Sequence, residues 1–160
     1  MQRISIVEAD PQGADALALL RAAALEARQL YPELFEPGMP WPTNDPTPSR
    51  GLYVLAYLDD TPVAMGAHRP LNDRQTELRR TYVATVARRT GLARKVIAWL
   101  EQHALEQGFS EVLLETGYKQ LAAMRLYEAC GYCRVEPFGQ YAGDPTSVCY
   151  AKLLASERAA

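Results

Sequence analysis

A short cationic loop that contains a glycine is the segment with the clearest chemical potential. It reads Val83-Ala-Thr-Val-Ala-Arg-Arg-Thr-Gly-Leu-Ala-Arg94, and no Asp or Glu interrupts the chain from Arg79 to Lys95. N–H groups at the start of a helix lack intrahelical partners and bind anions, and Gly91 lets a ligand approach the backbone closely. The arginines add charge-assisted contacts. The loop predicts a pyrophosphate site, although a capped helix with solvated arginines would show the same residues.

Composition narrows the class of protein that carries this loop. The chain has 160 residues, 48% hydrophobic and 22% charged, which is typical of one globular domain. A net charge of −2 argues against a protein that coats nucleic acid or an anionic membrane. Three cysteines cannot form a closed disulfide framework, and no apolar stretch is long enough to span a bilayer. These features predict a reduced, cytoplasmic protein.

Periodicity and turn residues predict the elements that must position the loop. The alternation at 3–8 predicts a strand, and Asp10-Pro11 reads as the cap of a helix whose apolar stripe ends at Tyr31. Six prolines between 32 and 50 exclude one regular element there. Further strands are predicted at 52–58, 62–69, 76–83, 111–116, 133–138 and 147–153, with helices from Leu92 to near Gly108 and at 121–129. The order predicts an α/β domain with a mixed sheet.

Two further motifs accompany the loop. Glu77-Leu-Arg-Arg-Thr-Tyr-Val83 precedes it, and Ala123-Met-Arg-Leu-Tyr-Glu-Ala-Cys-Gly-Tyr132 follows it. In order and spacing, the three motifs resemble the GNAT superfamily of N-acetyltransferases over about 52–153. The loop is similar to that family's Q/R-x-x-G-x-G/A signature, with Arg88, Gly91 and Ala93 in the defined positions. Four residues depart mildly from the pattern: Arg89, Ala93, Gln120 and Tyr132.

The resemblance implies a fold and a cofactor. It implies a single domain over 1–160, of α/β (α+β) class, with a mixed sheet flanked by helices and a splayed central strand pair. An acyl-CoA-binding core would cover about 76–131, and acceptor-side elements about 28–50 and 138–147. Acetyl-CoA would be the co-substrate, without a metal. Its binding residues would be Tyr82, Val83, Arg88, Arg89, Thr90, Gly91, Leu92, Ala93, Arg94 and Gln120.

The pantetheine arm of acetyl-CoA would pair with the main chain at Tyr82 and Val83 like an added strand. The imperfect alternation across Arg79-Arg80-Thr81 allows a bulge that would open the sheet there. An N–H group near Val83 could then polarise the thioester carbonyl.

Transfer of an acetyl group to an amine requires two proton movements. A base must deprotonate the ammonium group, and an acid should protonate the departing thiolate. Tyr127 matches the family's leaving-group tyrosine. Glu77 is the first candidate for the base and Glu115 the second, and water remains open as an alternative.

Trp41, His68 and Tyr141 are the candidates for acceptor binding. Trp41 lies in the proline-rich tract, His68 near the predicted opening, and Tyr141 in the loop between the last two strands. Cys130 and Cys133 have C-x-x-C spacing but no second pair, and we interpret them as packing residues. His103 is interpreted in the same way.

The leading hypothesis is an N-acetyltransferase that moves an acetyl group from acetyl-CoA directly to a primary amine of a small molecule or amino acid. It would bind no nucleic acid or membrane, and a homodimer is plausible from the resemblance. Two alternatives stay open. One is a protein N-terminal or lysine acetyltransferase, and the other is a non-catalytic acyl-CoA-binding sensor.

Overall fold

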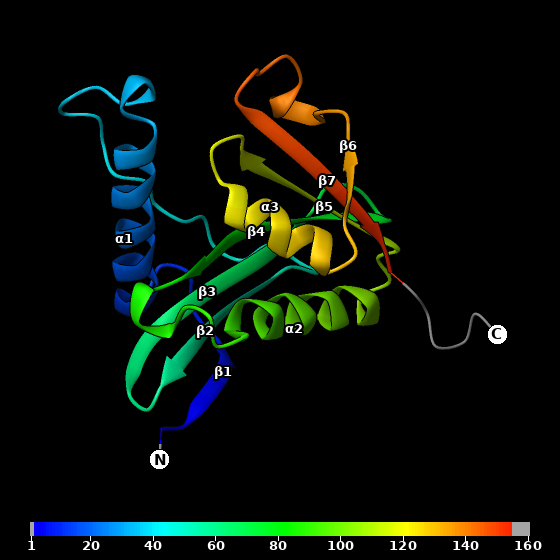
Figure 1. Ribbon diagram of the computed structural model, residues 1–160. Coiled ribbons are helices and arrows are strands. Elements are labelled where there is room, and N and C mark those ends of the chain that lie inside the picture. Colours follow the sequence, from blue (N-terminus) through cyan, green and yellow to red (C-terminus); the bar gives the residue numbers. More distant parts are fainter. Residues whose placement is uncertain (1, 155–160) are drawn as a thin grey trace.

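A seven-stranded mixed sheet forms the framework of the molecule. The computed structural model describes residues 2–154 (Figure 1). The strand order is β1-β2-β3-β4-β5-β7-β6, and every neighbouring pair is antiparallel except β4 and β5, which are parallel. The strands are β1 (Ile4–Glu8), β2 (Leu52–Leu58), β3 (Thr61–Pro70), β4 (Gln75–Val83), β5 (Glu111–Gly117), β6 (Cys133–Val135) and β7 (Ser147–Leu153). The α-helices are α1 (Ala14–Leu30), α2 (Leu92–Glu106) and α3 (Leu121–Ala129), and three short 3-10 turns complete the described elements.

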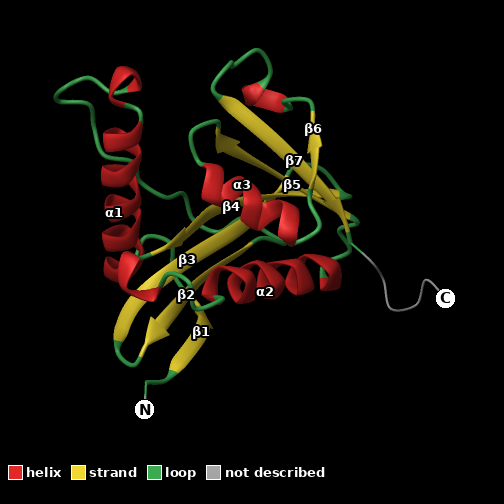
Figure 2. Cartoon of the chain, viewed as in Figure 1, coloured by secondary structure: helices red, strands yellow, loops and turns green. Residues whose placement is uncertain are grey.

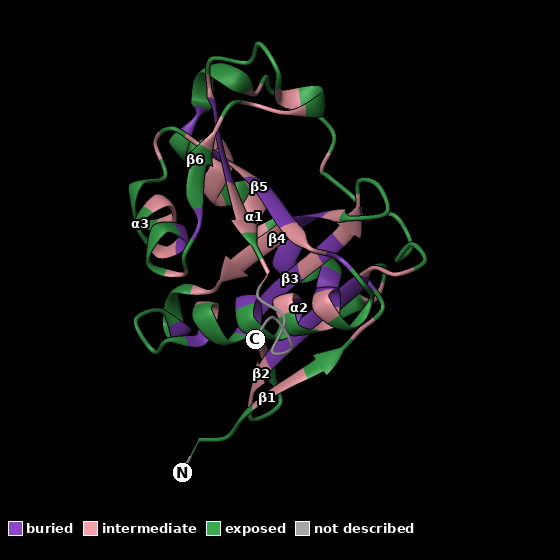
Figure 3. Cartoon of the chain, turned by 90° about the vertical axis from the view of Figure 1, so that its right-hand side faces the viewer, coloured by how far each residue is buried: buried purple, intermediate pink, exposed green. Residues whose placement is uncertain are grey.

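Helices cover both faces of the sheet. The larger core joins α2 and α3 to one face, through residues such as Val96, Leu100 and Tyr127. The smaller core joins α1 to the other face, where Leu19 and Leu20 meet inward residues of β2 and β3. Figure 3 shows buried residues concentrated along the central strands. The predicted mixed-sheet fold is therefore confirmed.

The start of the first helix was predicted wrongly. The helix begins at Ala14 with Gly13 as its N-cap, and Asp10 instead closes a turn in which its carboxylate accepts the Gln12 N–H at 2.9 Å. An Asp side chain bonds the N–H two residues ahead equally well in a turn, so the local sequence does not distinguish the two. The final strand pair is also shorter than predicted, since β6 ends at Val135 before Pro137.

The proline-rich tract runs from the end of α1 back toward the sheet (Figure 2). Trp41 stacks on two guanidinium groups of α1, with its ring centre 4.2 Å from Arg21 Cζ and 3.8 Å from Arg28 Cζ. Further along, the buried Asn44 donates from Nδ2 to the Pro11 carbonyl at 2.8 Å. The tract is thus attached to α1 and to the turn before it.

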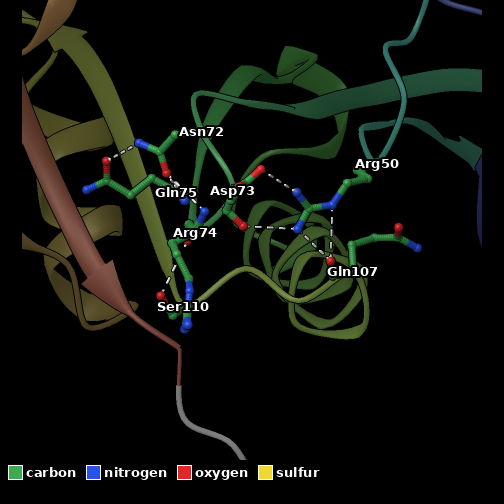
Figure 4. Close-up of polar contacts among 7 residues, drawn as sticks. All are labelled: Arg50, Asn72, Asp73, Arg74, Gln75, Gln107 and Ser110. Carbon is green, nitrogen blue, oxygen red and sulfur yellow. Dashed lines mark hydrogen bonds and ion pairs between the residues drawn. The ribbon is translucent and has the colours of Figure 1, made fainter.

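Arg50 attaches the other end of this tract to the far end of the sheet. Its guanidinium donates to the Gln107 carbonyl at 2.7 Å and to the Asp73 carbonyl at 3.1 Å (Figure 4). It also lies 4.0 Å above the ring centre of Phe109. These contacts join the segment before β2 to the turns that follow β3 and α2.

The central strands part half-way along β4, as the sequence predicted. Pairing of β4 with β5 stops at Leu78 and Leu114, although both strands continue. The register with β3 shifts at the same place, because Arg80 and Thr81 lie opposite the single residue Gly66. Arg80 adopts a φ of 62°, which a non-glycine residue reaches only with strain. Beyond Leu78, no strand among residues 2–154 pairs with the open edge of β4.

Gly66 lets α2 pack closely against this bulge. A Cβ atom at this position would lie 2.7 Å from Val96 Cγ1 and 2.9 Å from Leu100 Cδ1. We predict that Gly66→Ala lowers the free energy of unfolding by about 1–3 kcal/mol, the usual effect of overpacking. Urea denaturation measures it. The double variant Gly66→Ala/Val96→Ala should lose less stability than the sum of the losses of the two single variants, because Val96→Ala removes the atom nearest to the added Cβ. Strictly additive losses would contradict this packing.

Candidate active site

The cationic loop presents a run of free N–H groups. It follows a 3-10 turn at Thr85–Ala87, and its backbone curls through positive φ values at Arg89 and Gly91. The Thr90 hydroxyl donates to the Ala87 carbonyl at 2.6 Å and holds the curl. Within the described part of the chain, no hydrogen bond engages the N–H groups of residues 89–94. A Cβ atom on Gly91 would meet nothing within 4 Å, so the space above the loop is open.

Arg88 joins this loop to α1. Its guanidinium bonds both carboxylate oxygens of Glu26, at 2.7 and 3.0 Å, and its Nε donates to the Val83 carbonyl at 2.8 Å. The Tyr82 hydroxyl donates to the same carboxylate of Glu26, and burial, followed by this hydrogen bond, raises the pKa of Tyr82 to about 12. The side chains of Arg88 and Tyr82 therefore fix the shape of the loop, whose outward groups are backbone N–H groups.

Tyr127 lies on the α2 side of the gap between β4 and β5. It is 7% exposed and packs edge-on against Tyr132, with ring centres 6.0 Å apart. Burial raises the pKa of Tyr127 to about 12, so the hydroxyl keeps its proton at neutral pH. The nearby side chain of Thr81 opposes part of this rise in the pKa of Tyr127. The buried Thr81 hydroxyl has no hydrogen-bond partner among residues 2–154. The hydroxyls of Tyr127 and Thr81 are thus polar groups within an otherwise apolar core.

Glu77 lies on the opposite face of β4, which faces α1. Its carboxylate is 1% exposed, accepts the Tyr141 hydroxyl at 2.6 Å and pairs with Arg69 Nε at 3.2 Å. Burial, followed by the hydrogen bond to Glu77, raises the pKa of Tyr141 to about 12. The structure thus brings together two sequence candidates that are 64 residues apart.

Glu115 is a second buried carboxylate beside the gap. It lies on β5 just past the last pair with β4, and it accepts the Ser147 hydroxyl at 2.7 Å. Burial raises the pKa of Glu115, and the nearby Glu77 adds to the rise. No other hydrogen bond to its carboxylate joins it to the described residues. A raised pKa and a free oxygen are the properties of a general base.

A cavity of about 280 Å³ lies on the same face, between the proline-rich tract and the sheet. Three arginines line it, Arg69, Arg79 and Arg80, against one carboxylate, that of Asp45. Arg80 donates from Nε to Asn44 Oδ1 at 2.9 Å, so the tract that roofs the cavity is attached to the bulge in β4.

The remaining sequence candidates differ in their place. His68 belongs to the lining of this cavity, but it is buried and its ring bonds Thr76 Oγ1 at 2.8 Å and His103 Nδ1, on α2, at 2.9 Å. Trp41 packs on α1, outside the cavity lining. Gln120 caps α3 through its backbone, and no hydrogen bond engages its side chain among the described residues.

Comparison with known proteins identifies the family. The family model of the acetyltransferase (GNAT) family matches residues 19–132, which include the cationic loop, the parted strands β4 and β5 and all of α3. The chain belongs to the GNAT family of acetyltransferases.

The individual relatives that the chain resembles are also named as acetyltransferases. The chain is 32% identical over 101 residues to the N-acetyltransferase YsnE of Bacillus subtilis, covering 62% of this chain and 67% of that one. It is 36% identical over 78 residues to an IAA acetyltransferase of Azospirillum brasilense, covering 49% and 51%. It is 39% identical over 62 residues to human N-acetyltransferase 8, covering 39% of this chain and 27% of the human protein. The chain thus spans only part of these relatives' lengths.

Solved structures agree with the fold over almost the whole chain. A structure described as a putative acyl-CoA N-acyltransferase from Klebsiella pneumoniae is 29% identical, with a TM-score of 0.75, and the match covers 97% of this chain and 99% of that one. An IAA acetyltransferase from Bacillus cereus, 17% identical with a TM-score of 0.67, covers 95% and 100% and shows the same fold. Membership of the GNAT family supports acyltransferase activity.

No described helix combines the length and the apolar character needed to cross a membrane. No group of three or more His, Cys, Asp or Glu side chains among residues 2–154 is arranged to hold a metal ion.

Sequence reasoning missed several residues of this GNAT site. Glu26 was not a candidate in the sequence: the buried residues of α1 are Ala16, Leu19 and Leu20, and Glu26 lies on the side of this helix that reaches Tyr82 and Arg88. Arg79 was noted only as part of a cationic stretch and of the segment that allows a bulge. The signal that could have found it is strand alternation, which puts residues 77 and 79 on one face.

The pair formed by His68 and His103 predicts a pH dependence of stability. Burial lowers the pKa of His68 from 6.5 to about 4, so the unfolded chain binds a proton more readily than the native protein below pH 6.5. This contribution to stability is complete above pH 6.5 and is lost as pH falls toward 4, by roughly 3 kcal/mol in all. Between pH 4 and 7, the free energy of unfolding measured with urea should change less steeply with pH for His68→Gln than for the wild-type protein. Equal slopes for the two proteins would contradict the account.

Proposed function

We propose that this GNAT chain is an N-acetyltransferase that moves an acetyl group from acetyl-CoA directly to a primary amine of a small molecule. The observation that carries this proposal is the adjacency of two unsatisfied backbone surfaces, the open edge of β4 beyond Leu78 and the free N–H groups of residues 89–94. One suits an extended amide-bearing chain and the other a diphosphate. Acetyl-CoA combines both chemistries and supplies an activated acetyl thioester.

The residues of the loop fit a diphosphate. Consecutive N–H groups at a helix start, with open space above Gly91, form a site for an anion. Arg89 and Arg94 flank this run of N–H groups and bring positive charge, while Arg88 is engaged with Glu26. In this proposal the main chain at Tyr82 and Val83 holds the pantetheine arm, and Gln120 lies at the start of the helix on the far side of the gap.

Tyr127 is the proposed general acid. Because burial raises its pKa to about 12, the hydroxyl is protonated at neutral pH and can donate to sulfur as negative charge develops there. A thiol with a pKa near 8.5 is already a moderate leaving group, so the acid contributes to the rate without being essential.

Glu115 is the proposed general base, in preference to Glu77. Both oxygens of Glu77 are engaged, one by Tyr141 and one by the cation Arg69. Glu115 has one hydrogen-bond donor, from Ser147, and its pKa is raised by burial, which makes its carboxylate more basic. Glu77 then serves to hold Tyr141 and Arg69 in position beside the acceptor.

Thiol release from acetyl-CoA with a panel of amines tests the proposed function. The wild-type protein should release CoA only when an acceptor amine is present. Tyr127→Phe keeps the packed ring and should lower kcat by roughly 10²- to 10⁴-fold, with acetyl-CoA affinity little changed. Acetylation of proteins alone would favour the protein-acetyltransferase alternative. Tight acetyl-CoA binding without any turnover would favour the sensor alternative.

The pH dependence of kcat separates the two carboxylates. The acidic limb of the wild-type profile should have its midpoint above the ordinary glutamate value of about 4.3, since the pKa of Glu115 is raised and activity is lost when it is protonated. Glu115→Gln should lower kcat and remove this limb, whereas Glu77→Gln should retain it. The reverse pattern would identify Glu77 as the base.

A further inference from the structure

Arg79 is a cation without a partner, although the two other arginines that line the cavity are engaged. It is half-buried, and no hydrogen bond or ion pair joins its guanidinium to another residue in the range 2–154. Its neighbour Arg69 is paired with Glu77, and Arg80 is bonded to Asn44 and to the Thr43 carbonyl. Guanidinium groups carry five donors and are seldom left unused when they are partly removed from water.

The fold directs Arg79 toward the acceptor side of the sheet. Leu78 belongs to the core under α2, so Arg79 projects from the opposite face, next to Ala67 on β3. There it lines the cavity of about 280 Å³ under the proline-rich tract. Burial raises the pKa of Glu115 and the pKa of Tyr141, and the charge of Arg79 opposes part of each rise. Arg79 thus lines the cavity and is also near enough to Glu115 and Tyr141 for its charge to affect both.

The cavity has an excess of positive charge. Arg79 and Arg80 are adjacent, and their like charges repel one another. Burial lowers the pKa of Arg80, and the positive charge of Arg79 lowers it further. The one carboxylate in the cavity lining, Asp45, is exposed, and no ion pair joins it to a described residue. An anionic ligand would relieve this repulsion and fill the donor capacity of Arg79. The volume is below the range of drug-sized pockets, which suits a small ligand.

We infer that the acceptor is an amine that also carries a carboxylate, the chemistry of a free amino acid, and that Arg79 binds this carboxylate while the amine lies beside Glu115. The inference rests on the proposed function and specifies its substrate class. The Arg79 guanidinium holds the acceptor through two charge-assisted hydrogen bonds, one to each oxygen of the carboxylate. The acetyl group passes from sulfur to nitrogen as the carbon–sulfur bond breaks. The ammonium group loses two protons: one goes to Glu115 and then to solvent, and the other returns to Tyr127, which gives its own proton to the departing thiolate.

Matched pairs of acceptors test this inference. The panel holds the common amino acids and their primary amides, with kcat/KM compared at equal concentrations of free amine. The wild-type protein should prefer the acids by at least about 10-fold. Arg79→Gln should raise KM for the acids by roughly 10- to 100-fold and change KM for the amides little. Arg74→Gln, an exposed arginine whose backbone alone makes the contacts in Figure 4, is the matched control and should behave as wild type.

The outcomes separate this inference from the proposed function. Turnover with amides as good as with acids, or equal losses for both in Arg79→Gln, would overturn the role of Arg79 and leave the acetyltransferase intact. Absence of turnover with every amine would overturn the proposed function. Calorimetry with N-acetyl amino acids and CoA then tests Arg79 by itself. Tighter binding of acids than of amides, lost in Arg79→Gln, supports the carboxylate site, and equal binding overturns it.

Discussion

The site depends on the missing hydrogen-bond ladder between β4 and β5. The two strands pair over only four residue pairs and then separate, because β4 gains an extra residue at the bulge formed by Arg80 and Thr81. Backbone N–H and C=O groups left without partners are costly when they are removed from water. In our account, the extended arm of a ligand satisfies those groups on the open edge of β4. Everything that performs chemistry in our account lies along this gap: Tyr127 on one face, and Glu77, Arg79 and Glu115 on the other.

The surrounding structure holds the gap open from both sides. On one face, Gly66 lets α2 press against β3 opposite the bulge. On the other, Arg80 bonds Asn44, which in turn bonds the turn before α1. Glu26 of α1 reaches both Tyr82 at the end of β4 and Arg88 in the loop. The strained backbone of Arg80 is therefore fixed by contacts of its own side chain, a common arrangement at functional sites.

The sequence could predict the order of elements, the cationic loop and the opening of the sheet, because these follow from local periodicity, glycine placement and motif spacing. It could not predict pairings that depend on distant segments. The rotation of α1 about its axis decides whether Glu26 faces solvent or Arg88, and the many small alanines of this helix leave that rotation undetermined in the sequence. Trp41 was expected beside the acceptor, whereas two arginines one heptad apart hold it on α1. Whether these residues touch substrate stays a prediction.

Hydrogen exchange of backbone amides with and without CoA tests the central claim most directly. Our account predicts that CoA slows exchange in two segments, residues 79–83 of β4 and residues 89–94 of the loop. In the first, the edge of β4 toward β5 is unpaired, although the other edge pairs with β3, and in the second the N–H groups lack partners within the described chain. The turn at residues 71–74, at the opposite end of β4, should exchange at the same rate in both samples. Protection of both segments would confirm that the gap is the acyl-CoA site. Unchanged exchange in both segments at saturating CoA would contradict it.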